Sequence, residues 1–116
     1  MRVEETREED VTILSFTGEI DTYAVSDLKD LLKRLLGDGH LKLVLDLSDL
    51  SYLCSAGIAT LITMSERVHS RGGRMAICGI QGQVKETLRI LQLDRTSTVL
   101  GMFRSLEDAL EDMQEP

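Results

Sequence analysis

Residues 43–58 of this chain read LVLDLSDLSYLCSAGI, and they carry more information about its fold than any other stretch. The apolar run at residues 41–47 predicts a strand that is buried on both faces of a sheet. A short loop is expected at residues 48–54, and a helix is expected from Ser55 to about residue 71. The stretch therefore predicts a buried strand that leads through one loop into a helix.

Strands and helices alternate on both sides of this stretch. Residues 11–17 have strand composition, and their alternation places Ile13 and Phe16 on opposite faces. The acidic run before them either continues as an edge strand or hangs loose. The other expected elements are a helix at 24–36, a strand at 74–80, a helix at 83–91, a strand at 98–100 and a helix from 105. This order predicts an α/β fold, in which partner and ligand sites tend to lie at the carboxyl ends of strands.

The composition excludes several classes of function. The chain has 116 residues, which suits one domain, and its 13 basic and 20 acidic residues give a net charge of −7. Nucleic acid is not an expected partner, because binding phosphate requires a basic patch or stripe. Aromatic residues make up only 3%, and Trp is absent, so platforms for stacking bases or sugars are not expected.

The chain is also expected to be cytoplasmic and not inserted in a membrane. Its apolar runs are shorter than the roughly 18–20 residues of a membrane span, and its charged N-terminus does not resemble a signal peptide. Cys54 and Cys78 form no CxxC motif and have no histidine at metal-ligand spacing. We therefore expect two free thiols, no metal site and no cofactor.

Ser55 has two interpretations. As the N-cap of the second helix, its hydroxyl would accept a hydrogen bond from a free backbone N–H and contribute about 1 kcal/mol. As a phosphorylation site, it would gain roughly −1.5 to −2 charges at neutral pH. The N–H groups and the dipole at a helix N-terminus tolerate such a charge, so the fold would survive the change.

The motifs as a set resemble one known family. Residues 44–58, preceded by Gly-Glu-Ile-Asp at 18–21, resemble the STAS domain of bacterial anti-sigma factor antagonists. Gly72-Gly73 and the spacing of Val84, Leu88 and Leu93 add to the resemblance, which covers about residues 11–110. It implies that residues 1–116 form a single STAS domain with a mixed β-sheet of four to five strands and about four α-helices.

The resemblance also implies a function. Members of this family are small cytoplasmic proteins that bind an anti-sigma factor, itself a serine kinase, and so release a sigma factor. Phosphorylation of the serine that matches Ser55 abolishes that binding, and a phosphatase restores it. The chain is therefore expected to be an anti-sigma factor antagonist whose partner surface includes the loop at 49–55 and the second helix. The expected partner-binding residues are Asp21, Cys54, Ser55, Ala56, Gly57 and Met64.

The chain departs from the family pattern directly before Ser55. Cys54 stands where the family usually has Asp, and Ala56 replaces the common Ser or Thr. The loss of the acid removes a charge and a hydrogen-bond acceptor beside the hydroxyl, which bears on recognition by a kinase. Cys54 is expected either to be buried where strand and helix join or to act as a redox-sensitive thiol near a helix N-terminus.

Three other side chains leave alternatives open. Asp21 matches the family's acid near the phosphorylation site, so it either shapes the partner surface or, with Thr22, caps the first helix. Met64 either makes an adaptable, exposed contact with the partner or fills a gap in the core. Asp46 is expected to order the adjoining loop through hydrogen bonds to the backbone.

Catalysis is not expected, and two other functions compete with the main interpretation. His40 and His69 show no pattern that would make either one a base for a Ser or Cys nucleophile, and no phosphate-binding loop motif is present. The first alternative is a STAS adaptor or scaffold that is not phosphorylated and belongs to a transport or sensory complex. The second is a STAS module that binds a nucleotide or another small molecule.

Overall fold

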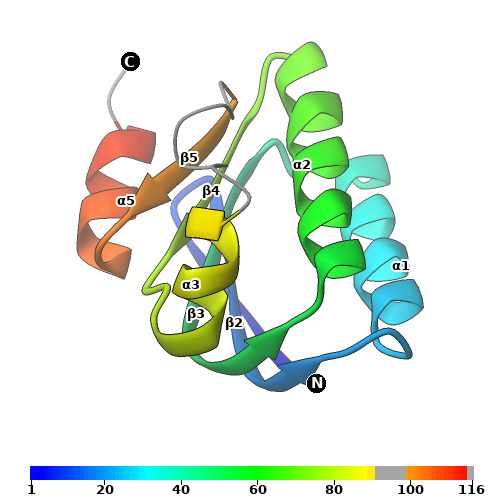
Figure 1. Cartoon of the computed structure of the whole chain (residues 1–116). Coiled ribbons are helices and arrows are strands. Elements are labelled where there is room, and N and C mark those ends of the chain that lie inside the picture. The colour runs from blue at the N-terminus through cyan, green and yellow to red at the C-terminus, as the bar shows by residue number, and fades with distance from the viewer. Residues whose placement is uncertain (91–98, 115–116) are drawn as a thin grey trace.

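A five-stranded mixed sheet organises the chain, with helices on both of its faces (Figure 1). The structure is a computed structural model that describes residues 1–90 and 99–114. The strands are β1 (Arg2–Glu8), β2 (Val11–Ile20), β3 (Lys42–Leu53), β4 (Arg74–Cys78) and β5 (Leu100–Phe103). The helices described are α1 (Val25–Gly37), α2 (Ser55–Ser70), α3 (Gly82–Ile90) and α5 (Leu106–Gln114). The strand order is β1-β2-β3-β4-β5, with β1 antiparallel to β2 and the other pairs parallel. The predicted α/β class with a mixed sheet is confirmed.

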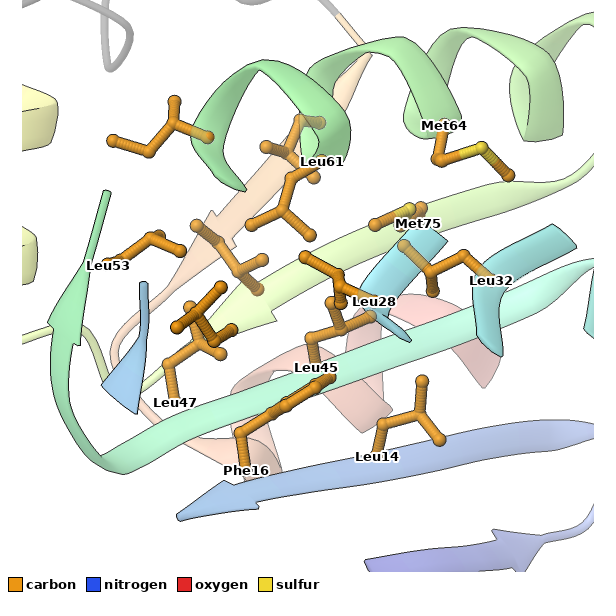
Figure 2. Packing of buried hydrophobic residues seen from close by; sticks show 14 of the residues in the cluster. Leu14, Phe16, Leu28, Leu32, Leu45, Leu47, Leu53, Leu61, Met64 and Met75 are labelled. Atoms are coloured by element: carbon orange, nitrogen blue, oxygen red, sulfur yellow. The ribbon is translucent and has the colours of Figure 1, made fainter. Parts of the chain in front are cut away.

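The two faces of the sheet bury separate cores. On one face, Leu14 and Phe16 of β2 pack into a large cluster with side chains of α1, α2 and α3. Figure 2 shows Leu28 of α1 and Leu61 of α2 pointing toward the sheet. On the other face, Val11 and Ile13 belong to a smaller cluster that α5 covers. The predicted alternation along β2 is confirmed, because successive side chains of a strand point to opposite faces.

The strand β3 is longer than the sequence predicted. Residues 48–53, expected in a loop, continue the ladder with β2 as far as the pair Ile20 and Leu53. The register shifts twice, because β3 has an extra residue between the pairs Ser15–Asp46 and Thr17–Asp49 and another opposite Gly18 and Glu19. Such bulges interrupt the alternation of side chains, which is why the pattern suggested a loop. Cys54 alone connects β3 to α2.

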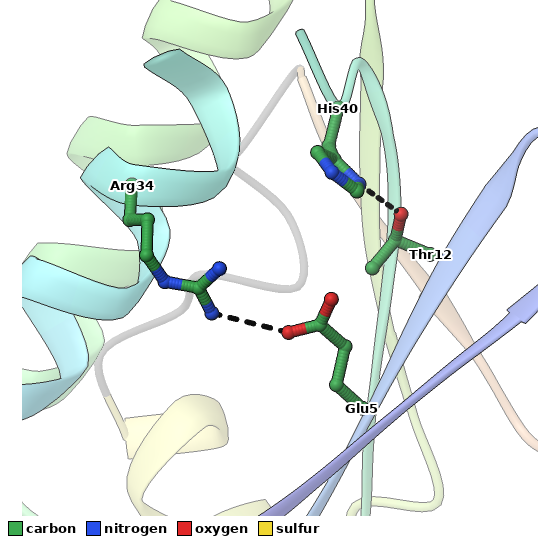
Figure 3. Close-up of polar contacts among 4 residues, drawn as sticks. All are labelled: Glu5, Thr12, Arg34 and His40. Carbon is green, nitrogen blue, oxygen red and sulfur yellow. Dashed lines mark hydrogen bonds and ion pairs between the residues drawn. The ribbon is translucent and has the colours of Figure 1, made fainter. Parts of the chain in front are cut away.

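The N-terminal run forms an edge strand. It pairs with β2 from Arg2 opposite Thr17 to Glu8 opposite Val11, so the interpretation as a loose tail is wrong. Glu5 of β1 accepts a hydrogen bond from Arg34 of α1 at 3.1 Å (Figure 3). This ion pair joins the edge strand to α1.

The remaining boundaries shift by a few residues. The strand predicted at 74–80 ends at Cys78, and the last strand extends from Leu100 to Phe103 instead of 98–100. The expected contributions of Leu91, Leu93 and Thr98 lie outside the described residues. Among the described residues, no helix has the length and apolar character needed to cross a bilayer.

Candidate functional site

The carboxyl ends of β2 and β3 lie next to each other and define the candidate site. The N–H of Cys54 donates a hydrogen bond to the carbonyl of Ile20 at 2.9 Å. This bond places Asp21, which follows β2, beside the start of α2 at Ser55. The structure thus brings together the residues that the sequence separated by more than thirty positions. Figure 1 shows that α1 and α2 both begin at this edge of the sheet.

Ser55 is the first residue of α2 and not its N-cap. The N-cap is Cys54, whose extended backbone (φ −78°, ψ 163°) precedes the helix. Ser55 is exposed, and its hydroxyl has no hydrogen-bond partner within residues 1–90 and 99–114. The interpretation of Ser55 as a capping side chain is therefore wrong, because the helix begins one residue earlier than a cap at Ser55 requires.

Cys54 is buried where β3 joins α2, as one of the two interpretations predicted. Its side chain is 9% exposed and makes no capping hydrogen bond. The carbonyl of Cys54 accepts the first helical bond, from Ile58 at 3.1 Å. The helix therefore begins with a residue that supplies no strong acceptor, at the position where Asp is favoured as a cap.

Gly57 lets the start of α2 approach the sheet closely. A Cβ atom at this position would lie 2.7 Å from Cδ1 of Leu53 and 3.2 Å from Cγ2 of Ile20. Leu53 is fully buried and Ile20 is 1% exposed, so neither side chain has free space to move into. Gly57 is buried, and a side chain here would push Ser55 away from the strand ends.

Asp21 organises the segment between β2 and α1. Its Oδ1 accepts a hydrogen bond from the N–H of Ala24 at 3.0 Å, and its carbonyl accepts from the same N–H at 3.1 Å. Ala24, and neither Asp21 nor Thr22, is the N-cap of α1. Asp21 therefore stabilises the turn that leads into the helix instead of capping the helix itself. Its side chain is exposed at the edge that carries Ser55.

Met64 is part of the core. It is only 3% exposed and belongs to the cluster between α1, α2 and the sheet (Figure 2). The expectation that Met64 is exposed is wrong, and its contact with a partner stays a prediction. The reason is that α1 packs against this side of α2, which the helical spacing of α2 alone could not reveal. Ile58, Leu61 and Val68 are buried as predicted, and Ile62 is partly buried.

Asp46 orders the polypeptide after it, as predicted. Its Oδ1 accepts hydrogen bonds from the N–H of Ser48 at 3.1 Å and from the Ser48 hydroxyl at 2.8 Å. Burial, together with the Asp46 carboxylate, raises the pKa of the Cys78 thiol to about 12. Cys54 and Cys78 are both free and buried.

Gln83 supports the site, and the sequence analysis did not identify it. Its Oε1 accepts from the N–H of Leu53 at 3.0 Å, and its Nε2 donates to the carbonyl of Leu53 at 3.4 Å. Nε2 also donates to Thr87 at 2.6 Å, which fixes the amide on α3. A glutamine at a helix start has no distinctive pattern, so only the tertiary structure could identify it.

Two tyrosines also lie at this edge and were missed. Tyr23 is 91% exposed in the turn before α1, and Tyr52 is 37% exposed near the end of β3. Exposed aromatic side chains are often anchors in protein interfaces. In the sequence, Tyr23 lies two residues after Asp21 and Tyr52 two residues before Cys54, and this proximity could have identified both tyrosines.

Neither charge nor a cluster of metal ligands marks the start of α2 among the described residues. Residues 50–62 include no charged side chain, so the start of α2 is neutral in a protein of net charge −7. Within the described ranges, no three His, Cys, Asp or Glu residues are grouped closely enough to hold a metal ion.

Comparison with known proteins identifies the family of this chain. A family model for the STAS domain matches residues 2–109. The anti-sigma-F factor antagonist RsfB of Mycobacterium tuberculosis is 30% identical over 100 residues, which cover 86% of this chain and 79% of RsfB.

Solved structures share the fold. An anti-sigma factor antagonist from Mycobacterium paratuberculosis superimposes with a TM-score of 0.86 at 23% identity, covering 98% of this chain and 94% of that one. The Bacillus cell fate determinant SpoIIAA in its phosphorylated form gives a TM-score of 0.73 at 14% identity, covering 97% of this chain and all (100%) of that one. At these identities the likeness concerns the fold alone.

Proposed function

The chain belongs to the STAS domain family, and we propose that it acts in the cytoplasm as an anti-sigma factor antagonist. In this proposal residues 1–116 form one STAS domain that binds an anti-sigma factor, itself a serine kinase, and so releases a sigma factor. One observation carries the proposal: Ser55 presents an exposed hydroxyl at the first position of α2, and this hydroxyl has no hydrogen-bond partner among residues 1–90 and 99–114. Phosphorylation of Ser55 switches binding off, and a phosphatase restores it.

The position of Ser55 suits a switch that leaves the fold intact. The first turn of α2 contains no acidic residue, so no carboxylate of the helix itself interacts with its free N–H groups and the positive end of its dipole. A phosphate there gains favourable interactions within the protein. The same phosphate adds charge to a stretch, residues 50–62, that has no charged side chain, and a partner that packs against it must then desolvate the phosphate.

The partner surface in this proposal combines α2 with the turn before α1. Asp21, Ser55 and Ala56 are exposed, and Tyr23, two residues after Asp21, supplies an aromatic side chain that is 91% exposed. Gly57 and Cys54 support this surface without being exposed on it, because both are buried and hold α2 against the strand ends. The chain itself acts by binding and not by catalysis.

The experiment combines the purified protein with ATP and a serine-kinase anti-sigma factor from the same genome. We expect one phosphate, located at Ser55 by mass spectrometry, and loss of the complex in size-exclusion chromatography after phosphorylation. Ser55→Ala should bind the kinase without being modified, and Ser55→Asp should bind weakly. Ser51→Ala is the matched control, since Ser51 is also exposed, but its hydroxyl donates to the carbonyl of Gly18 at 3.0 Å.

Two results would contradict the proposal. The first is a phosphate at Ser51 or elsewhere with Ser55 unmodified. The second is a Ser55→Asp variant that binds the anti-sigma factor as tightly as the unmodified protein.

Cys54 favours a second candidate function, that of an adaptor that is not phosphorylated. The N-cap of α2 has no side-chain acceptor, so the acid that the family usually places beside the serine is replaced by a buried thiol. In that case Ser55 remains unmodified in cells, and the protein co-purifies with a transport or sensory complex. Phosphoproteomics of the native protein separates the two functions.

A further inference from the structure

A groove between α1 and α2 extends away from Ser55. The two helices lie side by side on the same face of the sheet (Figure 1), and the groove between them has a volume of about 330 Å³. Its lining includes Lys29 and Lys33 of α1 and Ala56, Ala59, Thr63 and Arg67 of α2. It begins at Ala56, the residue after Ser55, so it is continuous with the candidate site.

The groove is rimmed by positive charge. Lys29 and Lys33 lie one turn apart on α1, and Arg67 lies on α2. All three are exposed, and their side chains have no hydrogen bond or ion pair with any residue the structure describes. No carboxylate is among the nine described residues of the lining. This local excess of cations is opposite in sign to the net charge of −7.

Small side chains line the groove along α2. Ala56, Ala59 and Thr63 recur at helical spacing along α2 and are exposed. The hydroxyl of Thr60 donates to the carbonyl of Ala56 at 2.9 Å, so this polar atom is already satisfied within the helix. Small side chains let another segment approach the helix backbones closely.

We propose that this groove docks an acidic amphipathic helix of the protein partner. From Ala56 to Arg67, α2 rises about 16 Å, which matches about three turns of an incoming helix. Apolar side chains one turn apart would pack against the small residues of α2, and carboxylates on both sides would meet Lys29, Lys33 and Arg67. This inference rests on the proposed function, since the helix that docks belongs to the anti-sigma factor.

The groove gives phosphorylation of Ser55 a second way to act. A phosphate on Ser55 adds negative charge at the end of the groove where Ala56 lies. It repels the carboxylates of the docked helix, in addition to obstructing the surface around Ser55 itself.

The test uses a synthetic peptide and needs no natural partner. The probe is a 14-residue, end-capped peptide with Leu at helical spacing and Glu at the other positions, titrated into ¹⁵N-labelled protein. We expect chemical-shift changes along α1 and α2 at the groove residues, weakening as salt is raised from 50 to 500 mM. The matched peptide with Lys in place of Glu should cause none.

Variants of the protein separate docking from nonspecific attraction. The double variant Lys33→Glu/Arg67→Glu should weaken peptide binding at least tenfold. Lys85→Glu, which changes an exposed lysine of α3 outside the groove, should bind as the unchanged protein does. Ser55→Asp should weaken binding by a smaller factor than the double variant.

Several outcomes would overturn the inference: no shifts with the Glu peptide, equal shifts with the Lys peptide, shifts centred elsewhere, or dimerisation of the protein through this face. The proposed function fails separately, if Ser55 is not phosphorylated by the kinase. If the double variant still binds the anti-sigma factor with full affinity, the proposal that the groove docks a helix is wrong, but the proposed function is not affected.

Discussion

The side-chain amide of Gln83 makes two hydrogen bonds to the backbone of Leu53, accepting from its N–H at 3.0 Å and donating to its carbonyl at 3.4 Å. The pairing of β3 with β4 ends at Asp46 opposite Cys78. Leu53 lies beyond that end, so Gln83 takes the place of a neighbouring strand. This contact fixes the backbone two residues before Ser55.

Loss of the Gln83 amide should loosen this end of β3. In Gln83→Ala, the N–H of Leu53 is left without its acceptor, and we expect the free energy of unfolding to fall by roughly 1–3 kcal/mol. Urea denaturation measures the fall, and hydrogen exchange should show faster exchange at Leu53. Thr87→Ala is the matched control, because it removes a partner of Gln83 but leaves both bonds to Leu53 in place. Equal exchange at Leu53 in both variants would argue against this role.

A side chain at position 57 should disturb the start of α2. In Gly57→Ala, the added methyl group meets buried Leu53 and Ile20, so we expect a loss of about 1–3 kcal/mol in the free energy of unfolding. Ala59→Ser, on the exposed side of the same helix, should change it by less than about 0.5 kcal/mol. Thermal unfolding followed by circular dichroism compares the two, and a Gly57→Ala variant as stable as the unchanged protein would exclude the close contact.

A negative charge at Ser55 should stabilise the isolated protein while it weakens the complex. Ser55→Asp places a carboxylate in the first turn of α2, where the helix dipole favours it by about 0.3–1 kcal/mol. The melting temperature should therefore rise slightly at low salt, and the gain should shrink at high salt. Ser55→Asn is the uncharged control and should show no salt-dependent gain.

Truncation of Met64 should show that it belongs to the core. Met64→Ala leaves a cavity between α1, α2 and the sheet, and we expect a cost of about 2–5 kcal/mol in the free energy of unfolding. An exposed methionine would cost less than about 0.5 kcal/mol. Urea denaturation distinguishes the two values, with Thr63→Ala as the control on the exposed side of α2.

The Cys78 thiol should be inert in the folded protein and should make stability fall at high pH. Burial, with Asp46 nearby, raises its pKa from 9.0 to about 12, so the folded state keeps a proton that the unfolded state loses above pH 9. Its contribution is therefore fully present below pH 9 and is lost as the pH rises toward 12. Cys78→Ala should show a shallower decline over this range than the unchanged protein. Rapid labelling of Cys78 by a thiol reagent at pH 8 under native conditions would contradict the assignment.

The order of the elements could be predicted from the sequence because each element has its own local period. The alternation along β2 and the helical spacing of Ile58, Leu61 and Val68 identified their buried faces correctly. The end of β3 could not be predicted, because the two bulges opposite β2 break its alternation. A bulge depends on how two strands pair and leaves no periodic signal of its own.

The candidate site shows the same division. Motif spacing alone located Ser55 at the start of a helix and Cys54 at the junction before it. Their contacts come from residues far away in the chain: Ile20 pairs with Cys54, Gln83 holds Leu53, and α1 covers Met64 and forms one wall of the cationic groove. Local periodicity and motif order report the forces between near neighbours, so they were sufficient for the α/β pattern and the position of Ser55. The exposure of Ser55, the burial of Met64 and the groove depend on packing between distant segments, and only the folded chain brings these segments into contact.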